Sequence, residues 1–285
     1  MTTTLEKAAP VAAKHRPVPS SLKVTQARVV RSEWIKFRSL RSTVITMAAG
    51  AIAVIGLGLL SAAFASGTIS SPDGGGGPPG GNDPTGISLS GVMLAQLIIG
   101  SLGVMMTSGE YTTGMIRSSL AAVPKRLPVL WGKAIVFAGV TFVVMLAATL
   151  VAFLGGQAIL SGAGVASASL GDTGVLRAIA GSALNLTGVG LMGIALGALL
   201  RSTAGAISTL FGIVLILPGL LQLLPSSWNA NIGPYLPSNA IESFTTVQAE
   251  AGSTMLSSGA GLAVFAAWVV VLLAGAAVLL KRRDA

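Results

Sequence analysis

The sequence has few of the side chains that catalyse reactions or bind metal ions. It contains no cysteine, which excludes disulfides and thiolate metal sites, and its only histidine, His15, lies in a polar N-terminal stretch. No H-E-x-x-H sequence, no pair of carboxylates and no Ser–His combination occurs in an apolar segment. We therefore expect no catalytic, cofactor-binding or metal-binding residues, and we do not expect an enzyme.

The chain also lacks the sequence by which many proteins bind ATP. No G-x-x-x-x-G-K-[ST] segment is present, and the one candidate, Gly132-Lys133, is followed by Ala134. The apolar segments have no Asp, Glu or His near their midpoints, where proton-coupled transporters usually place ionisable groups. Any energy that the protein uses is therefore expected to come from another polypeptide.

Charged residues are scarce, at 9% of the 285 residues, whereas soluble domains contain about 25%. The mean hydropathy is +0.81, and 52% of the residues are hydrophobic. A helix of about 20 apolar residues crosses the hydrocarbon core of a bilayer. The sequence therefore predicts an all-α integral membrane protein with six transmembrane helices, at about 43–65, 87–108, 134–154, 178–200, 203–224 and 259–280.

Basic residues gather in alternate connections between these six segments. Of the 18 Lys and Arg residues, nine precede the first apolar run, and Arg177 alone falls on the other side of the membrane. Five of the nine acidic residues also fall on that other side. Because cytoplasmic loops carry an excess of Lys and Arg, we expect both termini, including residues 281–285, in the cytoplasm. This placement explains the net charge of +9 without a nucleic-acid partner.

The N-terminal region has two parts. Residues 1–23 show no apolar periodicity and are predicted to be a disordered cytoplasmic tail. Residues 24–41 alternate apolar and basic positions at helical spacing, which favours an amphipathic helix in the headgroup region. A cytosolic extension of the first span is the alternative. Ala63-Phe64-Ala65 resembles a signal-peptidase site, but the long uncharged run before it favours a retained helix.

Three features of the later spans predict local structure. Lys133, at the start of the third span, is expected to extend to the membrane interface. The stretch after that span, residues 155–174, is expected to be an outside loop, like the Gly- and Pro-rich residues 66–86. Arg177 is expected to pair with Asp172 or to meet lipid headgroups.

The fourth and fifth spans contain residues that shape helices. Gly193 and Gly197 form a G-x-x-x-G pair, which allows close packing of two helices in lipid. Arg201-Ser202 is the whole turn to the fifth span, so these two spans should form an antiparallel hairpin. Pro218 should bend the fifth helix near its outer end, because proline removes a backbone hydrogen bond.

Residues 106–126 form the one sizeable internal connection with basic side chains. A short separate helix, 113–122, is predicted between Gly109 and Pro124, which interrupt helices. The order Glu110-Tyr111, Gly114, Arg117 and then Pro-Lys-Arg resembles the cytoplasmic loop of ABC-2 type transporter permeases, where this loop docks on the ATPase subunit. The resemblance implies the ATPase-coupling residues Glu110, Tyr111, Gly114, Met115, Ile116, Arg117 and Leu120.

A second resemblance lies between the fifth and sixth spans. Tyr235-Leu236-Pro237-Ser238-Asn239-Ala240 is similar to the second half of the external helical hairpin of these permeases. Its implied residues are Tyr235, Pro237, Ser238 and Glu242. Ser238 follows a proline at a position typical of a helix N-cap.

The resemblance implies a permease subunit of an ATP-driven transporter in the cell membrane. Such a subunit pairs with itself or with a relative, and an ABC ATPase hydrolyses the ATP. Small and apolar side chains along the spans point to a hydrophobic or amphipathic cargo, and the family makes export more common than import. Two other classes stay open: a membrane anchor or sensor without cargo, and a passive channel or secondary carrier.

Overall fold

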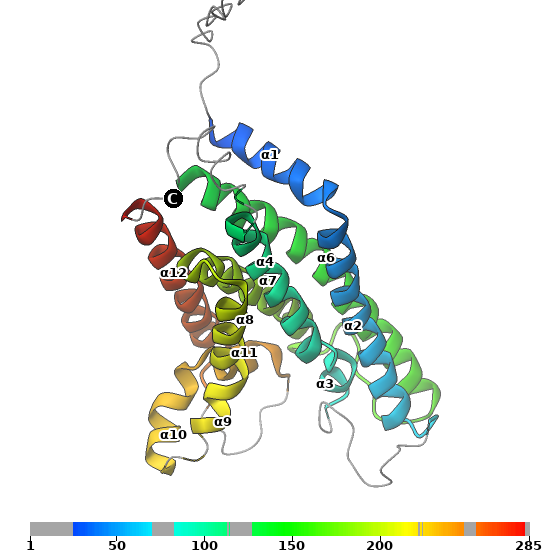
Figure 1. Cartoon of the computed structure of the whole chain (residues 1–285). Helices are drawn as coiled ribbons and strands as arrows, with labels where there is room; N and C mark the ends of the chain where they lie inside the picture. The colour runs from blue at the N-terminus through cyan, green and yellow to red at the C-terminus, as the bar shows by residue number, and fades with distance from the viewer. Residues whose placement is uncertain are drawn as a thin grey trace, which may run out of the picture.

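The computed structural model describes residues 25–69, 83–112, 114, 127–221, 223, 225–247 and 255–282. Within this part of the chain every regular element is a helix (Figure 1). In chain order the elements are α1 (Gln26–Ser39), α2 (Arg41–Ala65), α3 (Pro84–Leu89), α4 (Val92–Thr112), α6 (Leu127–Gly162), α7 (Val175–Leu200), α8 (Thr203–Phe211), η1 (Gly212–Ile216), α9 (Leu217–Leu221), α10 (Ser226–Ile232), η2 (Gly233–Tyr235), α11 (Pro237–Thr245) and α12 (Ser258–Arg282).

Six stretches of the described chain are long and apolar enough to cross a membrane. They are Arg41–Ala65, Pro84–Thr112, Leu127–Gly162, Val175–Leu200, Thr203–Leu221 and Ser258–Arg282. The predicted all-helical architecture with six transmembrane helices is therefore confirmed. The protein is a multi-pass membrane protein.

Helix α7 forms the centre of the bundle. In its most apolar stretch 78% of the residues are buried, against 22–44% in the other five spans. It packs against α4, α6 and α12 (Figure 1). The other helices therefore cover α7 and present their own outer faces to lipid.

Small residues allow α7 and α4 to approach closely. A Cβ atom added to Gly103 would lie 2.0 Å from the carbonyl oxygen of Gly190. One added to Gly193 would lie 2.4 Å from the carbonyl oxygen of Gly100, and the position of Gly197 is nearly as tight. The close packing predicted for Gly193 and Gly197 is thus confirmed, because any larger side chain would overlap backbone atoms.

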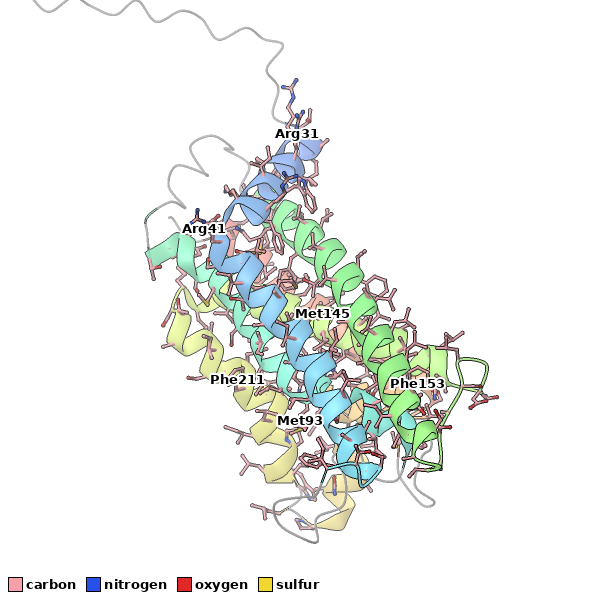
Figure 2. The ribbon with its side chains drawn as sticks, turned by 90° about the vertical axis from the view of Figure 1, so that its right-hand side faces the viewer. Arg31, Arg41, Met93, Met145, Phe153 and Phe211 are labelled. Atoms are coloured by element: carbon pink, nitrogen blue, oxygen red, sulfur yellow. The ribbon has the colours of Figure 1, made fainter. Side chains whose placement is uncertain are left out.

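Helix α1 lies across the first turns of α6 (Figure 1). It begins at Thr25, whose hydroxyl accepts a hydrogen bond from the backbone N–H of Arg28. Val29 and Phe37 are buried, and the rings of Phe37 and Phe137 meet edge to face with centroids 6.5 Å apart. Figure 2 shows Arg31 and Arg41 at the end of the molecule where α1 lies. A position of α1 in the headgroup region stays a prediction.

Two helices are longer than the sequence predicted. Helix α4 does not stop at Gly109 but continues to Thr112. Helix α6 continues to Gly162, although residues 155–162 were expected to be loop. Within this extension the buried amide of Gln157 donates hydrogen bonds to Pro84 O at 2.8 Å and Ser88 Oγ at 2.9 Å. These bonds hold the last two turns of α6 against α3.

The segment between the last two spans contains α10, η2 and α11. Ser238 is not the N-cap of α11: the cap is Leu236, and Pro237 is the first helical residue. That prediction was wrong because proline favours the first helical position and so moved the helix start back. In the preceding span, the π-helical turn η1 comes just before Pro218. The bend at Pro218 stays a prediction.

Arg177 contacts the start of α12 and the end of α11. It donates a hydrogen bond to Thr246 O at 2.8 Å and another to the hydroxyl of Ser258. Asp172 instead accepts hydrogen bonds from Ser169, from its backbone N–H at 2.7 Å and its hydroxyl at 2.8 Å. Of the two roles expected for Arg177, pairing with Asp172 is wrong, because the two side chains bond to other partners. Contact with lipid headgroups stays a prediction.

Candidate functional site

Four charged side chains from three helices meet at one end of the bundle. They are Glu33 and Lys36 of α1, Glu110 of α4 and Lys133 of α6, and we call them the charge cluster. Lys133 Nζ lies 2.9 Å from Glu110 Oε1 and 3.2 Å from Glu33 Oε2. Lys36 Nζ lies 2.8 Å from Glu33 Oε1 and 3.3 Å from Glu110 Oε1. Each ammonium thus contacts both carboxylates.

Helix geometry brings these groups together. Glu33 and Lys36 are three residues apart and so share one face of α1. Glu110 lies in the last turn of α4, and Lys133 lies in the second turn of α6. Because α1 crosses the start of α6, its Glu33–Lys36 face lies beside both helix ends.

The charge cluster is largely shielded from water. The side chains of Glu33, Lys133 and Glu110 are 2%, 4% and 11% exposed, and that of Lys36 is 32% exposed. Among the residues that the structure describes, the two positive and two negative charges of the charge cluster balance. Removing a single partner from such a group leaves an uncompensated buried charge, which costs about 3–5 kcal/mol in known cases. The charge cluster therefore fixes α1, α4 and α6 to one another.

The pKa of Lys36 is raised above its ordinary value. Burial is the largest single effect and lowers the pKa, since it disfavours the charged ammonium. The hydrogen bond from Lys36 to Glu33 and the negative charges of Glu110 and Glu33 together outweigh burial. Lys36 is therefore fully charged at neutral pH.

Tyr111 connects the end of α4 to the turn between α7 and α8. The guanidinium carbon of Arg201 lies 5.2 Å from the centroid of the Tyr111 ring, within the range of a cation–π contact. Arg201 has a φ of 52°, the left-handed backbone of a sharp helix end. One turn earlier in α4, the hydroxyl of Ser108 accepts a hydrogen bond from Thr203 at 2.8 Å.

Only part of the predicted coupling segment lies in the described structure. Gly114 has a φ of 71°, and its N–H donates to Tyr111 O at 3.3 Å, so the chain turns as α4 ends. The predicted helix 113–122 and the residues Met115, Ile116, Arg117 and Leu120 lie outside the described residues. The charge cluster therefore holds the two helix ends between which the segment runs.

The four residues predicted for the external hairpin lie far along the chain from the charge cluster. Tyr235 is exposed, and its carbonyl accepts a hydrogen bond from the indole N–H of Trp268 at 2.9 Å. Pro237 is buried, Ser238 is partly buried and Glu242 is exposed. The structure does not bring them together with Glu110 or Tyr111.

The sequence prediction missed three members of the charge cluster. Lys36 had been treated as one of the basic residues of an amphipathic helix, and Glu33 had been given no structural role. Lys133 was expected to extend to the interface, which is wrong, because its side chain is buried between two carboxylates. One signal was available: Glu33 is a lone acid in a basic helix, at the spacing of the apolar positions Val30 and Phe37.

Comparison with protein-family models identifies the family. The model described as ABC-2 family transporter protein matches residues 40–285. The chain belongs to the ABC-2 transporter family. A comparison with curated proteins found no match. The family and the six spans together make this ABC-2 protein a permease subunit of an ABC transporter, and helix α1 lies wholly before the matched region.

Proposed function

We propose that this ABC-2 permease exports a hydrophobic or amphipathic compound across the cell membrane, driven by a separate ABC ATPase subunit. It acts as a dimer with a second copy or with a related permease. Both termini lie in the cytoplasm, because 17 of the 18 Lys and Arg residues then face that side. The cytoplasmic side of the bundle is then the end that carries the charge cluster.

The contact between Glu110 and Lys133 carries the proposal for coupling. Glu110 lies at the start of the segment proposed to dock on the ATPase, which continues through residues 111–126, and Lys133 follows its end. Their oxygen and nitrogen are 2.9 Å apart. A force on the segment therefore acts on α4 and α6 as one body, instead of pulling their ends apart.

Helix α1 joins the same body through Glu33 and Lys36. Lys133 contacts the carboxylate of Glu33, so a displacement of α6 also displaces α1 and the start of α2. Tyr111 and Arg201 extend the connection to α8. Closure of the ATPase subunits would then rock the whole permease half, a rigid-body transition of the kind that switching proteins use.

Docking is tested by co-purification. The tagged permease should retain an ABC ATPase subunit, and replacement of Tyr111, Thr112, Thr113 and Gly114 by alanine should remove it. The variant Arg282→Gln is the control, because it removes an exposed basic residue at the end of α12, outside the docking segment. Retention of the ATPase by the four-alanine variant would contradict the docking assignment.

Coupling is tested separately with the double variant Glu110→Gln/Lys133→Met. It removes one acid and one base, so Glu33 and Lys36 stay as a balanced pair and the fold should survive. The ATPase should still co-purify.

A single cysteine at Leu223, which is 82% exposed, reports on the outer end of the fifth span. Its labelling rate should change with ATP in the parent protein and not in the double variant. An unchanged ATP response in the double variant would contradict coupling through the charge cluster.

A further inference from the structure

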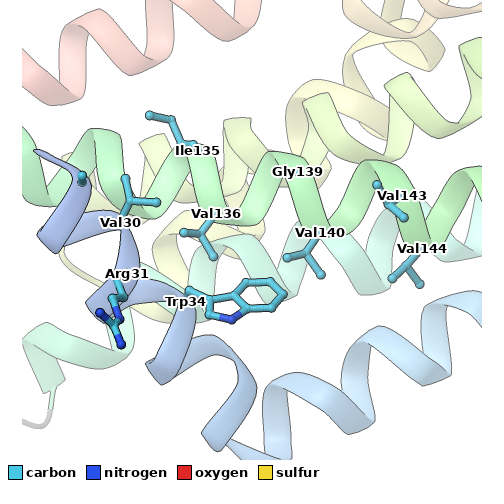
Figure 3. Close-up of a pocket in the computed structure, with 10 residues that line it drawn as sticks. Val30, Arg31, Trp34, Ile135, Val136, Gly139, Val140, Val143 and Val144 are labelled. Atoms are coloured by element: carbon cyan, nitrogen blue, oxygen red, sulfur yellow. The ribbon is translucent and has the colours of Figure 1, made fainter.

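An apolar groove lies between α1 and α6, on the side of α1 away from the charge cluster (Figure 3). Its volume is about 610 Å³, within the range of roughly 300–1,000 Å³ that ligand sites occupy. Figure 3 shows Val136, Val140 and Val144 along one side of α6, with the Trp34 ring between them and α1. Of the described residues that line the groove, only Arg31 is charged.

The groove runs along the membrane-spanning part of α6. Its lining on this helix extends from Ile135 to Val144, which corresponds to roughly 14 Å at 1.5 Å per residue. One leaflet contributes about half of a hydrocarbon core of about 30 Å. The groove therefore has the length of a lipid tail in a single leaflet.

The groove is open at the surface of the molecule. Ile135 and Val143 are 52% and 66% exposed, although both are fully apolar. Gly139 lies between them, and a Cβ atom added there would meet nothing within 4 Å. An open channel of this composition suits hydrocarbon and offers nothing to a polar ligand along its length.

The α1 end of the groove favours a negative charge. Arg31 is exposed there, and the same helix carries the exposed Arg28 and Arg38. The only acid in α1, Glu33, is buried in the charge cluster, and none of the described lining residues is an acid. Trp34 adds an indole, a group that prefers the level of lipid headgroups. Basic residues at this level attract anionic lipids.

We propose that the groove binds one anionic phospholipid, with an acyl chain along Val136, Val140 and Val144 and its phosphate at Arg31. The membrane location and the side chains of the groove support this lipid site. Lipid binding there requires neither ATP nor the cargo. A bound lipid would cover the groove side of α1, and the opposite side of this helix carries Glu33.

The test is native mass spectrometry of the full-length protein in detergent, after incubation with equal amounts of phosphatidylglycerol and phosphatidylcholine. The parent protein should retain one phosphatidylglycerol in preference to phosphatidylcholine. Arg31→Gln should reduce that preference about fivefold, the effect of one basic residue at a membrane surface. Arg38→Gln is the matched control: it removes an exposed arginine of the same helix that does not line the groove.

A second variant tests the acyl-chain site. Gly139→Trp fills the groove and should abolish retention of both lipids, whereas Gly56→Trp, at an exposed and equally open position of α2, should not. Elution of each variant at the parent volume in size exclusion shows that it is folded. Equal preference in Arg31→Gln and the parent, or full retention in Gly139→Trp, would overturn the proposal. If Gly139→Trp kept its lipid but lost the dimer, the groove would belong to a second copy. If it kept its lipid but lost cargo transport, the groove would belong to the cargo. Either result would also overturn the lipid proposal.

Discussion

Lys133 contacts two carboxylates, Glu33 and Glu110, that belong to different helices. Lys133→Met keeps much of the side-chain volume but leaves two negative charges facing Lys36 alone. We expect this variant to lower the free energy of unfolding by about 3–5 kcal/mol. Thermal or denaturant unfolding in detergent measures the change.

Lys36→Met provides the comparison for that measurement. Its side chain is eight times more exposed than that of Lys133, at 32% against 4%, so water already weakens its attraction to the carboxylates, which keep Lys133 between them when Lys36 is removed. The loss should be about 1 kcal/mol or less. Equal effects of the two variants would contradict the assignment of Lys133 as the central member of the charge cluster.

The raised pKa of Lys36 predicts how its contribution depends on pH. A group whose pKa is higher in the folded state stabilises the fold below its unfolded pKa of about 10.4, and loses that effect as pH rises through the folded pKa. The difference in unfolding free energy between the parent and Lys36→Met should thus be constant from pH 7 to about pH 10. A decline that starts below pH 9 would show that the pKa is not raised.

Glu110 illustrates what sequence can predict about single residues. The resemblance of its surroundings to the cytoplasmic loop of ABC-2 permeases implied a coupling role for it. Its partners could not be predicted, because Lys133 and Glu33 lie 23 and 77 residues away in sequence and only the packing of α1 on α6 unites them. Local patterns report which face of a helix is apolar, whereas they do not report which helix covers it.

At the scale of elements, glycines decide how closely α4 and α7 pack. Gly103→Ala would place a methyl group 2.0 Å from the carbonyl oxygen of Gly190, so the two helices must separate. We expect a loss of about 1–3 kcal/mol, the usual effect of overpacking. Gly109→Ala in the same helix is the control, because nothing lies within 4 Å of its added Cβ atom. The control should be neutral or stabilising by up to about 1 kcal/mol. Unfolding measurements on both variants test the pair, and a harmless Gly103→Ala would show that α4 and α7 are not in close contact.

The presence of the six membrane-spanning helices could be predicted from the sequence more reliably than the residues at which each helix ends. Six long apolar runs are visible to composition alone, since only a helix satisfies the backbone of so long a segment in lipid. In the extension of α6 past residue 154, the amide of Gln157 donates a hydrogen bond to Pro84, which lies in a distant part of the chain. Such tertiary contacts stabilise the last turns of this helix, and local composition does not reveal them.

For the molecule as a whole, sidedness is the property to measure. The chain contains no cysteine, so a single introduced cysteine reports on topology and no native cysteine has to be removed first. Leu223→Cys should react with a membrane-impermeant maleimide in intact cells, and Thr112→Cys should react only after the cells are opened. Both side chains are exposed. The reverse pattern would invert the orientation and would separate the docking segment from any cytoplasmic ATPase.

The burial of α7 has a consequence for synthesis. This helix leaves the ribosome well before α12, yet Phe265 of α12 lies against Gly188 of α7 in the finished protein. Between those two events the glycine-rich surface of α7 faces lipid or another membrane factor. Nascent chains that end before residue 258 should therefore be cleared rapidly by proteases of the membrane, and co-expression of the missing C-terminal helix should extend their half-life.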